Sequence, residues 1–147
     1  MKIDLDYMRK VVDVFINAPT ATIELSDLGK AGINFESVEN PNKFDDEFMF
    51  HFSLLVENGL ISNVKLEGYD LKALGLQVGY THDNYSVVPL RLTQSGHDFA
   101  SMLNQSEVFE NLKSNFKEMP FEVMIDAGKS LATAFMKKKV AELTGFN

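Results

Sequence analysis

Two histidines are the first candidates for chemistry in this chain of 147 residues, because the sequence contains no cysteine. His51 and His97 flank one predicted pair of strands, so their side chains could approach each other and bind a metal ion together with Asp98. The sequence has no His-Glu-x-x-His pattern or comparable spacing of metal ligands. We therefore predict structural roles: a ring nitrogen of His51 bonds a nearby backbone or carboxylate group, and His97 anchors the junction between a hairpin and a helix.

Serines and glycines offer no clearer catalytic pattern. Ser53 and Ser95 lack the Gly-x-Ser-x-Gly setting that exposes a nucleophilic serine on a tight turn. Gly68, Gly75 and Gly79 do not form the Gly-x-x-x-x-Gly-Lys loop that binds phosphate. The absence of cysteine also excludes thiolate catalysis and cysteine-based zinc sites. The sequence therefore predicts a protein that is not an enzyme and that binds no cofactor or metal.

A helix predicted at residues 44–58 organises the elements that would position these side chains. Asp45, Asp46 and Glu47 fall in its first turn, where the helix dipole stabilises negative charge. Spacing of three and four residues places an apolar set on one face of this helix: Phe48, Phe52, Leu55 and Val56. Gly59 can adopt the left-handed conformation that ends a helix, so a strand is expected to follow directly.

The other predicted elements extend on both sides of this helix. We expect, in order, a helix at Asp4–Asn17, a short strand at Thr22–Leu25, a helical turn at Asp27–Lys30, the central helix at 44–58, a strand at Ile61–Leu66, a long connector at Glu67–Ser86 and a strand at Val87–Leu92. Asp4 and Ser26 are suitable residues to cap the first helix and the helical turn. This order predicts an α+β, mainly α fold with a winged helix-turn-helix-like core, in which the last two strands form a β-hairpin wing.

Three further helices are predicted after the hairpin, at Thr93–Leu103, Asn104–Lys117 and Phe121–Leu143. Thr93 can cap the first of them, and Asn104 with Glu107 forms a capping pattern for the second. The last two helices would be additions to the core. We therefore predict a winged-helix-like domain at residues 1–103 and a C-terminal helical extension at 104–147.

The last predicted helix begins at Pro120 and would be about 35 Å long, which is long for so small a domain. It can fold back on the core, or it can leave apolar surface that pairs with a second copy of the chain. We predict a homodimer. The candidate interface residues are Phe121, Met124, Ile125, Leu131, Phe135 and Leu143.

Three sequence patterns connect this chain to a known family. Met-Lys-x-Asp-x-Asp-x-x-Arg-Lys is matched by Met1, Lys2, Asp4, Asp6, Arg9 and Lys10. His-x-x-Leu-Leu-x-x-x-Gly-Leu-Ile is matched by His51, Leu54, Leu55, Gly59, Leu60 and Ile61. Arg-Leu-Thr-x-x-Gly-His-x-Phe is matched by Arg91, Leu92, Thr93, Gly96, His97 and Phe99. The chain resembles a family of bacterial and phage- or prophage-encoded proteins known only as a domain of unknown function. The resemblance implies a winged-helix-like domain with no established activity.

The net charge of −7 argues against duplex DNA as the main partner. Residues 1–66 contain 6 Lys and Arg against 11 Asp and Glu, whereas affinity for DNA depends on neutralising its phosphates. Candidate nucleic-acid contacts would be Lys43, Lys65, Lys72 and Arg91. We predict a small regulator or adaptor of phage or prophage type that acts as a protein-binding module. A winged-helix DNA-binding transcriptional regulator is the alternative.

The sequence also bears on the compartment. It has no apolar run of about 18 residues, so we expect no membrane span. The N-terminus lacks the apolar segment of a signal peptide. We therefore expect a cytoplasmic protein.

Overall fold

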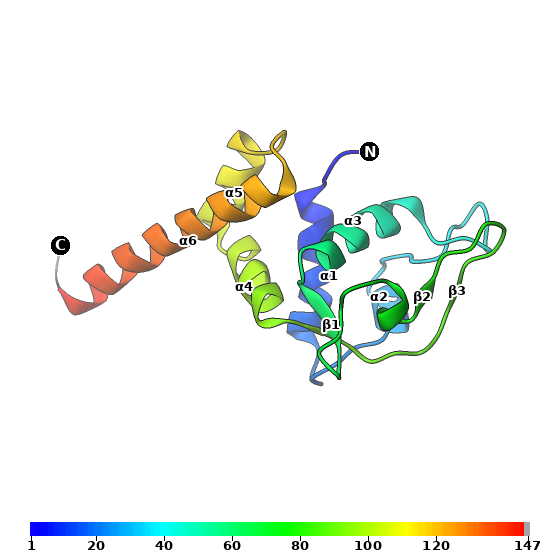
Figure 1. The fold of residues 1–147 in the computed structure, drawn as a ribbon. Helices are drawn as coiled ribbons and strands as arrows, with labels where there is room; N and C mark the ends of the chain where they lie inside the picture. Colours follow the sequence, from blue (N-terminus) through cyan, green and yellow to red (C-terminus); the bar gives the residue numbers. More distant parts are fainter. Residues whose placement is uncertain (146–147) are drawn as a thin grey trace. The chain divides into compact units, whose positions relative to one another are not determined.

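The computed structural model describes residues 1–145 and has an α+β architecture that is mainly helical (Figure 1). Its elements are α1 (Leu5–Asn17), α2 (Leu25–Lys30), α3 (Asp46–Glu57), β1 (Ile61–Asn63), the 3-10 helix η1 (Lys72–Leu74), β2 (Leu76–Gln77), β3 (Asn84–Tyr85), β4 (Leu90–Leu92), α4 (Gln94–Leu103), α5 (Ser106–Asn115) and α6 (Phe121–Thr144). Within residues 1–145, none of the helices combines the length and the hydrophobicity that a membrane span requires.

The chain forms two compact units, Met1–Asp98 and Phe99–Asn147. The division therefore lies within α4 and not after Leu103, the boundary expected from the sequence. The first unit contains both two-stranded sheets, and the second consists of helices.

Helix α1 begins at the predicted cap. Oδ1 of Asp4 accepts a hydrogen bond of 3.1 Å from the backbone N–H of Tyr7. This bond satisfies one of the amides that the first turn of a helix leaves unpaired. The buried residues of α1 are Leu5, Met8, Val11, Val12 and Phe15.

Helix α3 lies where the central helix is predicted. Oδ2 of Asp45 accepts the N–H of Phe48 at 3.0 Å and caps its start. At its end, Gly59 has a φ of +68°, and the N–H of Leu60 donates to the carbonyl of Leu55 at 2.9 Å. This is the predicted left-handed closure of a helix by glycine. The buried residues of α3 are Phe48, His51, Phe52, Leu55 and Val56.

Helix α2 begins earlier than predicted. The sequence suggested a cap at Ser26, but the N–H of Glu24 donates to the carboxylate of Asp27 at 2.8 Å, and the side chain of Glu24 accepts the amide of Asp27 in return. This reciprocal capping box starts the helix at Leu25. The short strand expected at 22–25 is therefore reduced to the single bridge at Ile23.

Strand β4 forms backbone hydrogen bonds on both of its edges. It pairs antiparallel with β1 in the register Ile61–Leu92, Ser62–Arg91 and Asn63–Leu90. On its other edge, Leu90 exchanges backbone hydrogen bonds of 2.8 and 2.9 Å with Ile23. The strand predicted at 87–92 is thus shorter than expected, since only its last three residues lie in the sheet.

The strand predicted at 61–66 ends early because Asn63 turns the chain. Its Oδ1 accepts the N–H groups of Lys65 at 2.8 Å and Glu67 at 3.1 Å, and its Nδ2 donates to the carbonyl of Ala73 at 3.1 Å. Leu66 adopts a φ of +64° within this turn. A side chain that bonds the following backbone in this way competes with a strand ladder.

The segment at 67–86, predicted as a connector with one helical turn, contains a second hairpin. Strands β2 and β3 pair in the register Leu76–Tyr85 and Gln77–Asn84. Two residues in each strand are too few for a periodic pattern to be visible in the sequence. The predicted helical turn is present as η1.

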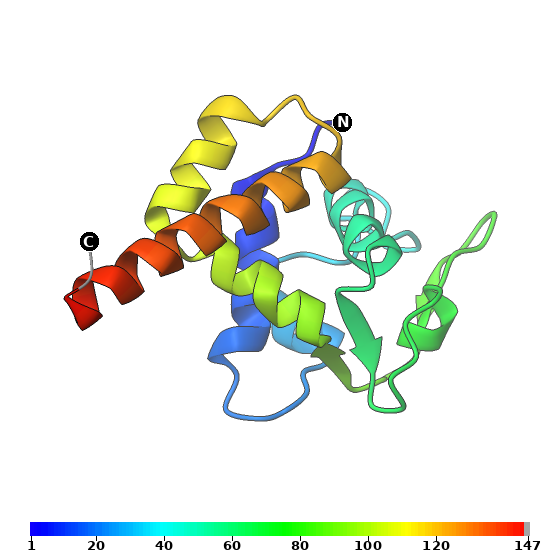
Figure 2. The ribbon, with the colours of Figure 1, turned by 60° about the vertical axis from the view of Figure 1, so that its left-hand side comes forward.

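The second unit is built on α6. Helix α5 lies beside the first half of α6 in both views (Figure 1, Figure 2). The rings of Phe99 and Phe121 meet edge to face at 5.7 Å, and Gly128 lies so close to Met102 that a Cβ would collide with its side chain. Phe121 and Met124, which we expected at a dimer interface, are instead buried within their own chain.

The start of α5 also differs from the prediction. Nδ2 of Asn104 donates back to the carbonyl of Ala100 in α4 at 2.9 Å. Gln105 occupies the cap position without a side-chain capping bond.

Candidate protein-interaction site

His51 is buried on α3, and both of its ring nitrogens bond backbone groups. Nε2 accepts the N–H of Asp4 at 2.9 Å, and Nδ1 lies 2.8 Å from the carbonyl of Glu47. An amide can only donate, so Nε2 is unprotonated and Nδ1 donates to the carbonyl. This geometry confirms the predicted packing role and joins α3 to the start of α1.

Tyr7 packs against this histidine, with 4.6 Å between the ring centroids. Its hydroxyl is buried and has no hydrogen-bond partner. Burial, followed by the negative charges of Asp45 and Glu47, raises the pKa of Tyr7 well above its ordinary value of 10.0. The phenol therefore stays neutral, and its unpaired hydroxyl reduces stability.

Thr93 and Gly96, and not His97, hold the junction between β4 and α4. The N–H of Thr93 donates to the carbonyl of Leu60 at 3.0 Å, and its hydroxyl donates to the carbonyl of Gly59 at 2.6 Å. The same hydroxyl accepts the N–H of Gly96 at 3.0 Å and caps α4, as predicted. At Gly96, any Cβ would collide with the carbonyl oxygen of Leu60. His97 is exposed. The anchoring role predicted for it belongs instead to Thr93 and Gly96.

The structure does not assemble the metal site considered from the sequence. Both nitrogens of His51 are engaged with the backbone, and His97 and Asp98 are exposed. Within residues 1–145, no three His, Cys, Asp or Glu side chains are grouped so that they could hold a metal ion.

The four cations predicted to contact nucleic acid are in different settings. Nζ of Lys43 lies 3.4 Å from the carboxylate of Asp83 and donates to the carbonyl of Gly79 at 2.6 Å. Nη1 of Arg91 donates across the sheet to the hydroxyl of Ser62 at 3.0 Å. Lys65, in the turn after β1, and Lys72, at the start of η1, are exposed.

Asp83 fixes the hairpin of β2 and β3 to the segment before α3. Its side chain is only 7% exposed, and it accepts the N–H groups of Phe44 at 2.9 Å and Gly79 at 3.0 Å. Burial alone would raise the pKa of Asp83, but the two amides and the charge of Lys43 outweigh it and hold the pKa below its ordinary value of 3.8. Sequence reasoning missed this contact, because no local pattern indicates a bond across about 40 residues.

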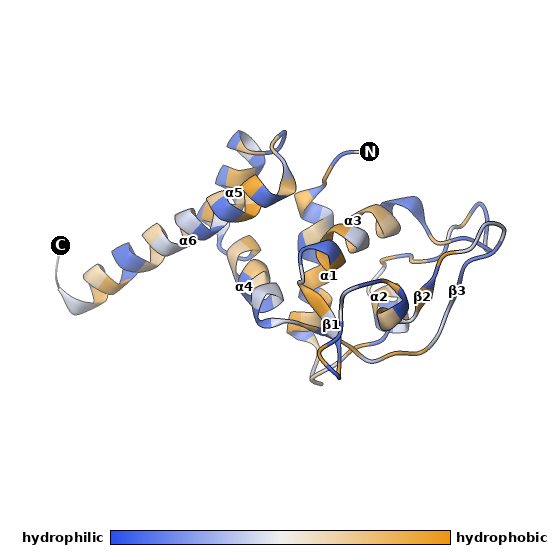
Figure 3. Ribbon diagram, viewed as in Figure 1, coloured by the Kyte–Doolittle hydropathy of each residue, from blue (hydrophilic) through white to orange (hydrophobic). Residues whose placement is uncertain are grey.

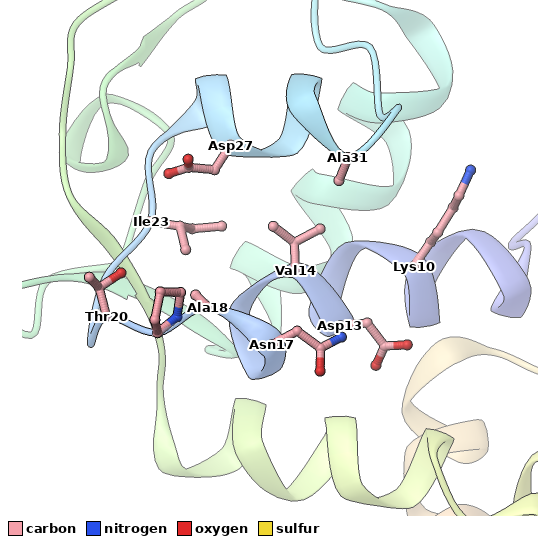
Figure 4. Close-up of a pocket in the computed structure, with 10 residues that line it drawn as sticks. Lys10, Asp13, Val14, Asn17, Ala18, Thr20, Ile23, Asp27 and Ala31 are labelled. Atoms are coloured by element: carbon pink, nitrogen blue, oxygen red, sulfur yellow. The ribbon is translucent and has the colours of Figure 1, made fainter.

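A cavity of about 600 Å³ lies between α1 and α2 (Figure 4). Ile23 and Val14 point into its centre, whereas Lys10 points away from them. Asp13 on its wall forms an ion pair of 4.0 Å with Arg9. The lining residues do not place a nucleophile beside a base, so we assign this cavity no chemistry.

A second cavity, of about 680 Å³, is a groove beside the second half of α3. Its walls come from α3, from the segment before η1, from η1 and from β2. We call it the α3 groove, and its lining residues are Ser53, Val56, Glu57, Tyr69, Asp70, Leu71, Lys72, Leu76, Gln77 and Val78. All of these residues belong to the first unit.

Large apolar side chains on the walls of the α3 groove are open to solvent. Tyr69 is 76% exposed and Val78 is 61% exposed, although both line the groove. Tyr80 follows on the same hairpin and is fully exposed. Exposed apolar groups gathered at a groove are typical of a surface that binds another molecule.

The charge around this groove is mainly acidic. Glu57 and Asp70 line it, against the single cation Lys72. The negative charge of Glu67 raises the pKa of the neighbouring Tyr69, followed by a smaller effect of burial. Farther along α3, the exposed side of the first turn is also acidic, with Asp46 and Glu47. A ligand with positive charge would therefore be favoured here.

Sequence reasoning did not identify the α3 groove. Tyr69, Leu71 and Val78 lie in a segment rich in glycine and turn-forming residues, which we treated as a connector. The available signal was the number of large apolar and aromatic residues in this segment, which exceeds what a solvated loop needs.

Comparison of the chain with protein-family models, with curated proteins and with solved structures found no match. The function is therefore inferred from the residues and their geometry.

Proposed function

We propose that this protein is a non-enzymatic adaptor or small regulator that binds a protein partner through the α3 groove. The main supporting observation is that Tyr69 and Val78 are exposed on the walls of a groove of about 680 Å³. Covering such apolar surface gains roughly 25 cal/mol per Å². Aromatic side chains in this position often dominate the binding energy of an interface.

The charge of the groove defines the partner more closely. Glu57 and Asp70 would attract Lys or Arg, whereas Tyr69 and Val78 would contact apolar side chains. The partner proposed here is a peptide segment that contains both basic and large apolar residues. A groove of this size accommodates a few side chains of such a segment.

We further propose a winged-helix-like fold for the first unit. The order α1, Ile23, α2, α3, β1 and β4, with β4 between Ile23 and β1, supports this assignment. The patterns shared with the phage and prophage family contribute to the junction of α3, β1 and α4, where Gly59, Thr93 and Gly96 meet. The same proposal includes a regulatory role of phage or prophage type and a location in the cytoplasm.

The alternative, a DNA-binding regulator, has weaker support. In a winged helix, α3 would enter the major groove and the hairpin after it would contact the backbone. Here Asp46, Glu47 and Glu57 on α3 are exposed and would repel phosphates. Lys43 and Arg91 already bond groups of their own chain.

The test is selection from a random peptide library on the immobilised protein, followed by titration of the selected peptide. We expect enrichment of peptides with basic and large apolar residues. The variant Val78→Asp should weaken binding by about tenfold or more, because a charge replaces apolar contact area. The matched control is Val38→Asp, which changes another exposed valine that lies outside the groove and should bind as the wild type does.

The same assay separates the two candidate functions. A random duplex of about 20 base pairs, titrated at low salt, should bind much more weakly than the peptide. Micromolar binding of the duplex, lost on replacing Lys65 and Lys72 by Glu, would instead favour the DNA regulator. Equal binding of the selected peptide by both aspartate variants would exclude the α3 groove as its site.

A further inference from the structure

Helix α6 is too long for its neighbour in the second unit to cover. It has 24 residues, whereas α5 beside it has 10. At about 1.5 Å per residue, this difference in length means that α5 cannot cover roughly 21 Å of α6. Buried residues occur only in the first half of α6, and the second half extends beyond α5 in both views (Figure 1, Figure 2).

This second half is not a polar helix end. Hydrophobic residues alternate with hydrophilic ones along all of α6 (Figure 3). Met136 is 48% exposed, Val140 is 53% exposed and Leu143 is 78% exposed. Leu131 and Phe135 are partly exposed. Leaving side chains of this size in water forfeits free energy that burial would gain.

Exposed and partly exposed apolar residues form a row along one side of α6. At about 100° per residue, five positions fall within about 80° around the helix axis. We call this set the α6 stripe: Ile125, Ala132, Met136, Val140 and Leu143. It adjoins the side that contains the buried Phe121, Met124 and Gly128, since Phe121 lies about 20° from Ala132 around the axis.

Two opposite charges border the α6 stripe on the same flank. Asp126 and Lys137 fall about 20° apart around the axis, one in each half of the helix. No acidic residue stands three or four positions from Lys137, so no ion pair along the helix can neutralise it. Asp126 and Lys137 are both exposed.

We propose that the α6 stripe binds the same stripe of a second copy of this chain, with the two helices antiparallel. If the two-fold axis passes between Leu131 and Ala132, Asp126 of each copy lies opposite Lys137 of the other. In the same register, Ile125 of each copy inserts between Met136 and Val140 of the other. One register therefore satisfies both the charges and the apolar residues, as an isologous interface requires.

The opposite orientation does not fit. In a parallel pair, the two copies of each flanking residue fall on opposite sides of the interface, and Asp126 and Lys137 are separated by about 16 Å along the helices. Neither charge would then meet its opposite in the second copy. The charge pattern thus selects the antiparallel pair. This interface lies in the second unit and does not depend on the α3 groove.

Sedimentation velocity over about a hundredfold range of concentration tests the proposal on the full chain. The wild type should pass from the monomer mass to twice that mass. Asp126→Lys and Lys137→Asp should each raise the dissociation constant by about tenfold, because symmetry repeats each change in two pairs. The double variant D126K/K137D should restore the wild-type constant, since it only exchanges the two charges.

Lys138→Asp is the matched control, because residue 138 lies about 100° farther around the helix, away from the stripe. This variant should dimerise as the wild type does. Circular dichroism verifies that every variant keeps its helices. A monomer mass at all concentrations would overturn the proposal. Single variants that dimerise normally, or a double variant that does not recover, would also overturn it.

Discussion

Replacing His51 tests whether this residue is a structural link. His51→Ala removes a buried ring and leaves the N–H of Asp4 without its acceptor. Truncating a buried side chain of this size costs about 2–3 kcal/mol, and an unpaired backbone amide costs about 1–3 kcal/mol more. We expect a total near 4 kcal/mol, a large part of the stability of a domain of this size.

Two conservative variants separate these contributions. Gln places an oxygen near the position of Nε2 and can still accept the N–H of Asp4. Asn reaches only the position of Nδ1 and can still donate to the carbonyl of Glu47, a bond within α3 itself. Because the bond to Asp4 joins α3 to α1, we expect stability to fall in the order His, Gln, Asn, Ala.

Urea unfolding followed by circular dichroism gives the free energy of unfolding of each variant. Tyr7→Phe is the control, since it keeps the ring that packs against His51 and removes only an unpaired hydroxyl; it should not destabilise the protein. If His51→Gln proves as unstable as His51→Ala, the bond to Asp4 contributes nothing. Zinc that raises the melting temperature of the wild type would also refute the structural role.

Two further predictions concern contacts between distant segments. Asp83 has a lowered pKa, so its carboxylate stabilises folding above about pH 3.8, and this contribution is lost as the pH falls through the lower value of the folded state. Asp83→Asn should therefore be less stable by about 2 kcal/mol at neutral pH, and the difference should shrink as the pH falls below about 3.8, measured by urea unfolding at each pH; a constant difference would contradict this. Gly96→Ala should cost about 3 kcal/mol by thermal unfolding, because its Cβ meets the carbonyl of Leu60, whereas Ser95→Ala should change little.

The parts of the fold that local chemistry determines could be predicted from the sequence. Asp4 caps α1, Gly59 ends α3 and Thr93 caps α4, each through bonds between residues close in the chain. The helices follow from apolar spacing over several turns. The structure of the segment at 67–86 could not be predicted, because its strands have two residues each.

The interactions missed from the sequence are mostly long-range. Asp83 bonds the amide of Phe44, and neither residue has a local pattern that indicates the other. Asn63 ends β1 by bonding the chain that follows, which a strand pattern does not reveal. The bonding role of His51 could be inferred from its place on an apolar helix face, but its partner Asp4 could not.

The site was the least predictable part of the molecule. The α3 groove forms only because η1 and β2 are folded beside α3, and the sequence showed neither their positions nor the exposure of Tyr69 and Val78. The acidic side of α3 was visible in the sequence, and its residues Asp46, Glu47 and Glu57 are exposed in the structure.

The most direct test of partner binding through the α3 groove is amide chemical-shift mapping by NMR. The isotope-labelled protein is titrated with the peptide selected on it. We predict that the shifts concentrate at residues 53–57 and 69–78, with residues 10–31 around the other cavity unchanged. Shifts confined to residues outside the groove, or no shifts at a saturating concentration of peptide, would contradict the proposed function.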